Sequence, residues 1–139
     1  MQILRWEDSM GREKPTARVT RRSEHQYQWG PPGMAKPRVL VTGASGYVAS
    51  QLLPTFHKRY DCTLIDVTTT DRDGHEVPDV QRQSLLVDDL DELRPLFTGC
   101  DAVVHLAFVR QTEDRHEQFE GEMDNIRMAY ILLLLFRGK

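Results

Sequence analysis

The chain has 139 residues, of which 40% are hydrophobic and 28% are charged, and its net charge at pH 7 is −3. This length fits one small domain, and the composition is that of an ordinary globular protein. The negative charge gives no reason to expect nucleic acid as a partner. The longest apolar run, 128–136, is much shorter than the about 20 residues that cross a bilayer, so we expect no membrane span.

The N-terminal segment 1–37 differs from the rest of the chain. It carries seven Lys/Arg against four Asp/Glu, a net charge of +3, whereas residues 38–139 carry −6. The segment has no apolar periodicity and contains four prolines, so we interpret it as a disordered leader. A basic arm for nucleic acid is less favoured, because acids alternate with the bases. Met34, just before the first predicted strand, is a candidate for the natural start of translation.

The stretch 38–49 has the pattern of a dinucleotide-binding turn. An apolar strand runs into a glycine turn and a helical pattern follows at once, which is the context that this fingerprint requires. Gly43 can adopt the angles of a tight turn, Gly46 lets a pyrophosphate approach the main chain, and Ala49 lets the helix pack close to the strand. The amides at the start of the helix would face the phosphates. The alternative is a glycine turn without a ligand.

Strand and helix patterns alternate from Arg38 onward. Apolar and β-branched runs predict strands, and apolar residues at three- and four-residue spacing predict helices. Pro54 is unusual in the first helix, because proline lacks an amide and is tolerated best in the first turns. The expected elements are strands at 38–42, 62–67, 80–87 (the weakest) and 102–107, and helices at 47–59, 89–97 and 117–136.

This alternation predicts an α/β fold, namely a partial Rossmann-like, doubly wound parallel sheet in the strand order 3-2-1-4, formed by residues 38–139. In such sheets a ligand binds outside the carboxyl ends of the strands, where the strand order reverses. The glycine turn and the end of the strand 102–107 meet there. The two cysteines, Cys62 and Cys100, fall in or beside strands, which favours free thiols and a cytoplasmic location.

Asp66 ends the second strand, 23 residues after Gly43. A carboxylate at about this distance can accept hydrogen bonds from the ribose hydroxyls of the adenosine half of NAD, and it repels the 2′-phosphate of NADP. We therefore expect NAD as the cofactor. Arg72, further along the loop, favours a phosphate, so NADP is not excluded. A strand-end acid facing solvent is the alternative.

The spacing of Gly43, Gly46 and Ala49 resembles the T-G-x-x-G-x-x-G fingerprint of the short-chain dehydrogenase/reductase superfamily. The Gly-Tyr-Val that includes Tyr47 and Val48 is most similar to the extended branch, the NAD-dependent epimerase/dehydratase family. The resemblance covers about 100 residues, the N-terminal half of the family's pattern. It implies that the cofactor contacts Gly43, Ser45, Gly46, Tyr47 and Val48.

Three later stretches continue this resemblance. In the family an acid follows the third strand and contacts the adenine. In this sequence Leu86 occupies the usual position of that acid. A two-residue deletion relative to the family would bring Asp88 into that position instead. An N-cap role for Asp88 or Asp89 is at least as well supported. The stretch 101–108 is similar to the family's D-x-V-x-H-x-A-A strand, which would place Leu106, Ala107 and Phe108 at the nicotinamide ribose. The helix 117–136 is similar to the family's asparagine-bearing helix, so Asn125 would brace strands and cofactor.

Two further candidates have simpler explanations. His105 lies on an apolar strand, where a packed core residue is more common than a catalytic base. The acid-rich stretch 113–124 also contains Arg115 and His116, so we interpret it as a solvated face and expect no metal.

The resemblance implies an oxidoreductase that acts on a sugar or nucleotide-sugar by hydride transfer to and from the nicotinamide. The family's catalytic pair is Tyr-x-x-x-Lys, but none of the four tyrosines has a lysine four residues later, so we assign no catalytic residue and expect this chain alone to be inactive. The leucine-rich end, 131–136, suggests a truncation or frameshift. The alternative is a non-catalytic dinucleotide-binding or redox-sensing module, or a pseudoenzyme, which could cover its open sheet edge as a homodimer.

Overall fold

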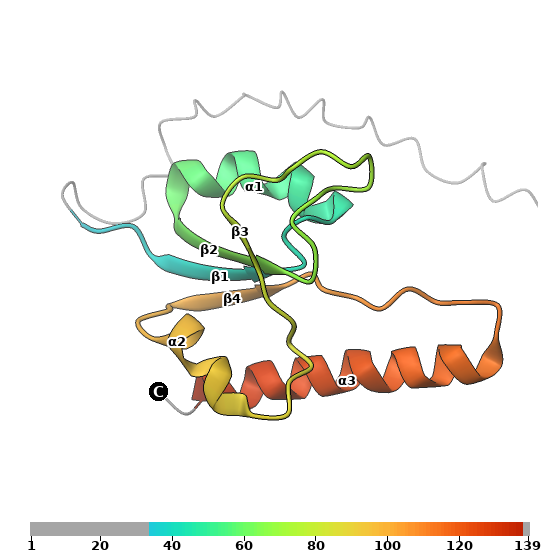
Figure 1. Cartoon of the computed structure of the whole chain (residues 1–139). Coiled ribbons are helices and arrows are strands. Elements are labelled where there is room, and N and C mark those ends of the chain that lie inside the picture. The colour runs from blue at the N-terminus through green and yellow to red at the C-terminus, as the bar shows by residue number, and fades with distance from the viewer. Residues whose placement is uncertain (1–33, 138–139) are drawn as a thin grey trace, which may run out of the picture.

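The computed structural model describes residues 34–137; the predicted leader therefore lies, up to residue 33, outside the described residues. Figure 1 shows one sheet with helices on both of its faces. In chain order the elements are β1 (Arg38–Thr42), α1 (Tyr47–Arg59), β2 (Asp61–Asp66), β3 (Val80–Arg82), the 3₁₀ helix η2 (Leu90–Glu92), α2 (Arg94–Phe97), β4 (Ala102–His105) and α3 (Arg115–Arg137).

The four strands form one parallel sheet in the order β3-β2-β1-β4. This is the predicted Rossmann-like order, and it is confirmed. The chain leaves β1 through α1 to reach β2 on one side, and returns later to place β4 on the other side of β1. The strand order therefore reverses at β1, and the carboxyl ends of β1 and β4 lie together at that point.

The apolar core has two layers because the side chains of β1 alternate between the two faces of the sheet. Val39 and Val41 pack with Leu53 of α1 on one face. Leu40, which is fully buried, packs on the other face with residues of α2 and α3. Figure 1 shows α1 on one side of the sheet and α2 and α3 on the other. The residues of α3 in this core are Met128, Ile131, Leu132 and Leu135.

The prediction of one continuous helix at 89–97 is wrong. The structure has the 3₁₀ helix η2, then Leu93, then the four residues of α2, with Pro95 near the start of α2. Proline lacks an amide and its ring clashes with the carbonyl four residues earlier, here that of Asp91, so a continuous α-helix is disfavoured at this point. Leu93 and Phe97 are nevertheless buried, as expected for the apolar face of this segment.

Other elements differ from the expected limits. β3 contains only three residues, and β4 ends at His105 instead of residue 107. Pro54 is the eighth residue of α1 and is exposed, so it lies beyond the first two turns. Cys62 and Cys100 are free thiols. Within residues 34–137, no helix has the length and apolar content needed to cross a membrane.

Candidate functional site

The turn after β1 requires glycine at Gly43. Its φ is +69°, in the left-handed region, and an added Cβ would lie 2.5 Å from the backbone nitrogen of Ala107 and 2.6 Å from the carbonyl carbon of Leu106. The amide of Gly46 donates to the carbonyl of Gly43 at 3.1 Å, and that of Ala44 donates to the carbonyl of Ile65 at 3.2 Å. The first bond closes the turn, and the second attaches it to the end of β2.

Helix α1 begins directly after this turn without a side-chain cap. Its N-cap residue is Gly46, in an extended conformation, and no side chain accepts a hydrogen bond from the first amides. Lys58 and Arg59 occupy the last turn, where positive charge complements the helix dipole. The start of this 13-residue helix therefore presents backbone donors and a positive dipole end to an anion.

Asp66, at the end of β2, is hydrogen-bonded to the glycine turn. Its Oδ2 accepts from the backbone amide of Ser45 at 3.0 Å and from the Ser45 hydroxyl at 2.7 Å, and its Oδ1 accepts from the amide of Val67 at 2.7 Å. An ionised carboxylate has about four acceptor positions. Three are used in these bonds, so Oδ1 can accept one more, for example from a ligand hydroxyl.

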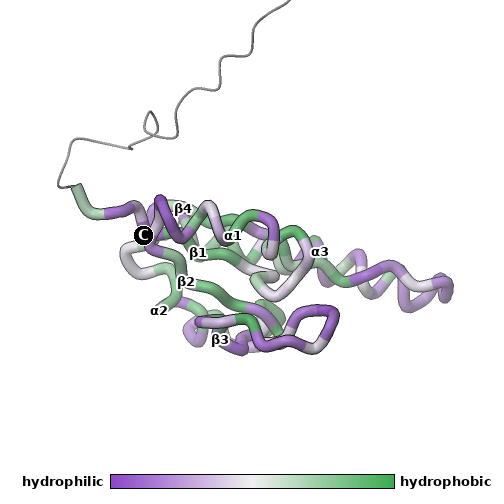
Figure 2. The backbone as a smooth tube through the Cα atoms, turned by 90° about the horizontal axis from the view of Figure 1, so that it is seen from above, coloured by the Kyte–Doolittle hydropathy of each residue, from purple (hydrophilic) through white to green (hydrophobic). Residues whose placement is uncertain are grey.

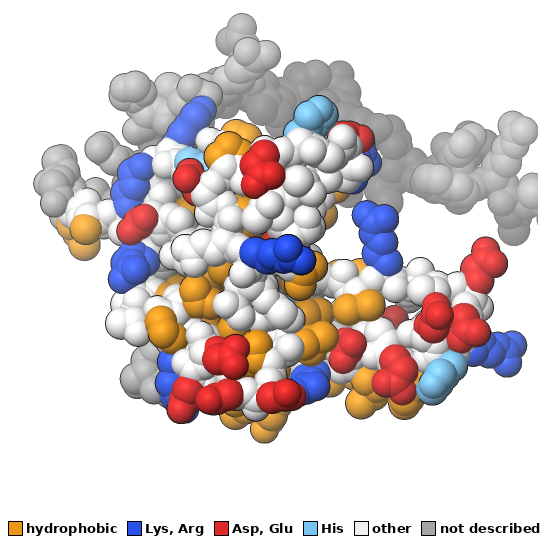
Figure 3. Space-filling model, in the orientation of Figure 1, with side chains coloured by type: hydrophobic (Ala, Val, Ile, Leu, Met, Phe, Trp, Pro, Cys, Tyr) orange, Lys and Arg blue, Asp and Glu red, His pale blue; other side chains and the backbone are white. Residues whose placement is uncertain are grey.

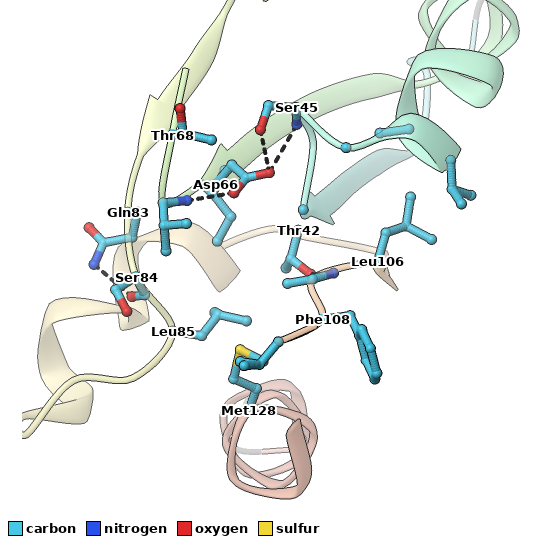
Figure 4. Close-up of a pocket in the computed structure, with 18 of the residues that line it drawn as sticks. Thr42, Ser45, Asp66, Thr68, Gln83, Ser84, Leu85, Leu106, Phe108 and Met128 are labelled. Carbon is cyan, nitrogen blue, oxygen red and sulfur yellow. Dashed lines mark hydrogen bonds between the residues drawn. The ribbon is translucent and has the colours of Figure 1, made fainter. Parts of the chain in front are cut away.

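These features surround an open groove of about 680 Å³. This volume lies in the usual range of small-molecule and cofactor sites. Figure 4 shows Asp66 and Ser45 on one side of the groove, Leu106 and Phe108 on another, and Met128 of α3 below them. The predicted site residues that line the groove are Gly43, Ser45, Gly46, Tyr47, Val48, Asp66, Leu106, Ala107 and Phe108.

Asp88 does not line the groove. It is exposed, whereas Leu86 does line the groove. The neighbouring Asp89 caps η2, because its side chain accepts a hydrogen bond from the amide of Asp91 at 2.9 Å. The N-cap alternative therefore applies to Asp89, and the structure places an apolar residue where the resemblance suggested an acid.

Asn125 also lies outside the lining of the groove. Its Oδ1 accepts from the amide of Val109 at 2.7 Å, and its Nδ2 donates to the carbonyl of Val109 at 3.3 Å. Both polar atoms of the side chain are thus used to attach the loop after β4 to α3. Since Phe108 and Val109 line the groove, Asn125 fixes one wall from behind.

His105 is half-buried and outside the groove lining. Its Nδ1 lies 2.7 Å from the hydroxyl of Thr42, and that hydroxyl accepts a weak hydrogen bond from the amide of Ala107 at 3.4 Å. Burial lowers the pKa of His105 below its ordinary value of 6.5. The ring is therefore neutral near pH 7, and we assign its Nδ1 as the acceptor of the Thr42 hydroxyl proton.

Several groove residues were not identified from the sequence. Thr42, Gln83 and Ser84 stand at or after the ends of β1 and β3, so the rule that ligands bind at strand ends could have identified them. Met128 comes from the distant helix α3, and no local pattern indicates it. Arg72 closes one side of the groove, with its guanidinium carbon 5.0 Å from the centre of the Tyr47 ring.

Asp71, Asp73 and His75 are the only group of potential metal ligands that come together in residues 34–137, with ligand atoms within 4.8 Å of one another. They lie in the loop after β2 and are largely exposed. Oδ1 of Asp71 already accepts from the amides of Asp73 and His75, both at 2.9 Å. These bonds stabilise the loop, and exposed acidic groups of this kind are common without an ion.

The parallel sheet, the glycine turn and the strand-end carboxylate define the class as a dinucleotide-binding α/β domain. The chain belongs to the NAD-dependent epimerase/dehydratase family, whose model matches residues 39–138. No curated protein matches the sequence.

Solved structures with the same fold include two sugar-modifying enzymes. Uronate dehydrogenase from Agrobacterium tumefaciens is 25% identical, with a TM-score of 0.54, over 76% of this chain and 38% of that one. A tyrosine-to-alanine variant of that enzyme, solved with NAD, is also 25% identical, with a TM-score of 0.54, over 75% of this chain and 37% of that one. UDP-N-acetylglucosamine 4-epimerase from Methanobrevibacter ruminantium M1, solved with UDP-N-acetylmuramic acid, shares the fold at 21% identity and a TM-score of 0.58, over 73% of this chain and 34% of that one. The chain thus spans less than two fifths of the length of these enzymes.

The groove fits the cofactor of the family. Gly43 and Gly46 both line the groove. An added Cβ at Gly46 would lie 3.1 Å from the carbonyl oxygen of Gly43, so glycine there keeps the turn tight. The uncapped start of α1 suits a pyrophosphate, and the remaining acceptor position of Asp66 suits a ribose hydroxyl. Apolar side chains, including Leu85 and Leu86, offer surfaces for a planar base.

Proposed function

We propose that residues 38–137 form the NAD-binding part of an oxidoreductase that acts on a sugar or nucleotide-sugar. The observation that carries this proposal is the position of the Asp66 carboxylate, hydrogen-bonded to Ser45 of the glycine turn and lining the same groove as the start of α1. The family and the NAD-bound solved structure support NAD as the cofactor. The sugar substrates of the similar solved structures support the substrate class.

The chain's own residues would bind and orient the cofactor. The amides at the start of α1 would hold the pyrophosphate, and Oδ1 of Asp66 would accept a hydrogen bond from the adenosine ribose. Leu106, Ala107 and Phe108 would contact the nicotinamide half, in the position that Asn125 fixes through Val109. NAD, when bound, supplies a nicotinamide ring that takes up or returns a hydride.

Proton transfer in this chain has no assigned residue. None of its four tyrosines is followed four residues later by lysine. We expect the 139-residue chain to bind NAD without turning over a sugar substrate. The C-terminal part of a relative can be added to the chain as a further test. If the chain then binds NAD but still turns over no sugar substrate, the non-catalytic module is favoured instead.

Titration calorimetry with NAD and NADP tests the role of Asp66. We expect one NAD per wild-type chain and weaker binding of NADP, because the carboxylate repels the 2′-phosphate. Asp66→Asn is expected to weaken NAD binding by about 10- to 100-fold, since a hydrogen bond to a charged group contributes about 1.5–3 kcal/mol. It is also expected to reduce the preference for NAD over NADP.

The ratio of the affinities for NAD and NADP distinguishes ligand recognition from a purely structural role of Asp66. If the substitution only displaced Ser45, which is hydrogen-bonded to Asp66, the binding of both cofactors would weaken equally. Asp61→Asn, at the other end of β2, is the matched control and is expected to leave both affinities unchanged; Asp61 is exposed and lies outside the groove. An unchanged NAD/NADP preference in Asp66→Asn would contradict the assignment.

A further inference from the structure

The order of the strands indicates where the adenine of a bound NAD would lie. The start of α1 follows β1, Asp66 ends β2, and residues 83–86 follow β3, so these three places stand in a row along one edge of the sheet. With the pyrophosphate at α1 and the adenosine ribose at Asp66, the base extends one strand further, to residues 83–86. We call this part the base end of the groove; it consists of Gln83, Ser84, Leu85 and Leu86.

The base end offers apolar side chains to a planar ring. Leu85 is buried, and the half-buried Leu86 packs against the same core. Figure 4 shows the Leu85 side chain on the groove side of this segment, above Met128, and the Gln83 amide on the opposite side. Figure 3 shows hydrophobic side chains on either side of the chain that descends from β3 to η2. The neighbouring loop between β2 and β3 is by contrast hydrophilic (Figure 2).

Hydrogen-bond acceptors at the base end are already in use. The carbonyl oxygens of residues 84–87 all accept hydrogen bonds from the chain itself. The four donors are Nε2 of Gln83, at 3.0 Å, the amide of Val87, at 3.1 Å, the hydroxyl of Ser84, at 3.4 Å, and Nη2 of Arg127, at 3.3 Å. The Ser84 hydroxyl also accepts from the amide of Leu86 at 3.0 Å. Each carbonyl therefore keeps only its second lone pair for a ligand.

Carboxylates of the described residues are also engaged elsewhere. Asp66 and Asp71 are those that line the groove. Asp66 is bonded to the glycine turn, and its remaining acceptor position is assigned to the ribose. Oδ1 of Asp71 accepts from two amides of its own loop, and its Oδ2 lies 3.4 Å from Nδ1 of His75. Asp88 is exposed and outside the lining, so the 6-amino group of adenine would meet no ionised acceptor.

We propose that Leu86 relaxes the base specificity of this site, so that the chain binds a dinucleotide by the ring face of its purine and does not require the 6-amino group as a donor. A carboxylate at this position would favour adenine, because it would accept a hydrogen bond from that group. Leu86 contacts any purine in the same way, through its hydrocarbon surface. This inference rests on the proposed function, since it requires NAD in the groove.

Titration calorimetry of the full chain with NAD and with its 1,N6-ethenoadenine analogue tests the inference. In the analogue, N1 and the 6-amino nitrogen are closed into a ring and carry no hydrogen. We expect the two dissociation constants of the wild type to agree within about threefold. Leu86→Asp is expected to bind NAD about 10- to 100-fold more tightly than the analogue, because adenine alone can donate to the new carboxylate.

Leu86→Asn is the matched variant of the same size. Its amide can both donate and accept, so it should bind the two dinucleotides about equally well. Asp88→Asn is the control for the neighbouring carboxylate and is expected to leave both affinities unchanged, because Asp88 lies outside the groove.

A wild-type chain that binds NAD more than about tenfold tighter than the analogue would overturn the inference and leave the proposed function intact. A loss of NAD affinity in Asp88→Asn would overturn it as well, as would a Leu86→Asp chain with wild-type circular dichroism that gains no preference for NAD. If neither dinucleotide binds the wild type, the proposed function fails and this inference fails with it.

Discussion

At the scale of single residues, Gly43 lies where the turn after β1 packs against the backbone of the segment that follows β4. A Cβ there would have to occupy the space where the backbone of 106–107 passes. Hydrogen bonds from this passing segment fix its position: the amide of Leu106 donates to the carbonyl of Thr42 at 3.0 Å, and that of Ala107 donates to the Thr42 hydroxyl. The glycine is therefore required by two independent constraints, its left-handed backbone and its close neighbour.

Gly43→Ala is expected to lower the free energy of unfolding by about 2–5 kcal/mol, measured by urea denaturation. The left-handed conformation costs roughly 1–2 kcal/mol for a residue with a Cβ, and overpacking against backbone adds about 1–3 kcal/mol. Gly74→Ala is the matched control, because Gly74 has φ +84° but no heavy atom within 4 Å of its added Cβ. Gly74→Ala should lower the free energy of unfolding only by the roughly 1–2 kcal/mol that the left-handed conformation costs. Equal losses in the two variants would show that the contact with 106–107 is unimportant.

His105 gives the folded protein a defined dependence on pH. Because burial lowers its pKa in the folded state, the unfolded chain binds a proton at higher pH than the folded chain does. Stability from the neutral ring is fully present above the ordinary pKa of 6.5 and decreases as the pH falls from there toward the folded pKa. Protonation would also turn Nδ1 into a donor, so the Thr42 hydroxyl could no longer donate to it.

Urea unfolding at pH 7.5 and pH 5 measures this dependence. His105→Gln is expected to lose less stability between the two values than the wild type does, since the glutamine does not titrate. His57→Gln, on the exposed side of α1, is expected to lose as much as the wild type. If His105→Gln kept the full decrease, another group would have to be responsible.

At the scale of elements, α1 has an uncapped first turn that suits an anion and a proline in its interior that is unfavourable for an α-helix. Pro54 lies in its third turn, where a residue with an amide would bond to the carbonyl of Ser50. Pro54→Ala is expected to raise the free energy of unfolding by about 1–3 kcal/mol, because the hydrogen bond and the higher helix propensity are both gained. Thermal unfolding followed by circular dichroism measures the change.

Thr55→Ala is the control for helix propensity alone, at the next exposed position of α1. It is expected to stabilise by only about 0.5 kcal/mol. A Pro54→Ala variant no more stable than Thr55→Ala would indicate that the helix is already adapted to proline, for example by a local bend that the substitution does not reverse.

The elements differ in how well the sequence predicts them. The limits of β1 and α1 agree with the prediction because a short apolar run and a glycine turn mark them sharply. The helix predicted at 89–97 failed because apolar periodicity was given more weight than Pro95, although proline disfavours helical angles in the residue before it. The leucine-rich end of α3, which suggested a frameshift, forms a regular helix with buried Ile131, Leu132 and Leu135 and exposed Leu133 and Leu134.

At the scale of the whole molecule, the topology explains why much of the groove was predictable. Residues at the carboxyl ends of parallel strands must meet at one edge of the sheet, so Gly43, Asp66 and Leu106 could be placed together from their order in the chain. Asp88 could not, because the path of the chain between β3 and η2 depends on packing. The same holds for Met128, because α3 has apolar residues on both sides and the fold decides which side faces the sheet.

We expect NAD to bind in the groove with its pyrophosphate at the start of α1. Titration of the ¹⁵N-labelled chain with NAD, followed by amide chemical shifts, tests it most directly. We expect the largest shifts at the amides of Gly46, Tyr47 and Val48, smaller shifts at Ala107 and Phe108, and none at Phe119, Ile126 and Tyr130, which are exposed on α3 outside the groove. No saturable shifts at millimolar NAD, or shifts confined to residues outside the groove, would contradict the account.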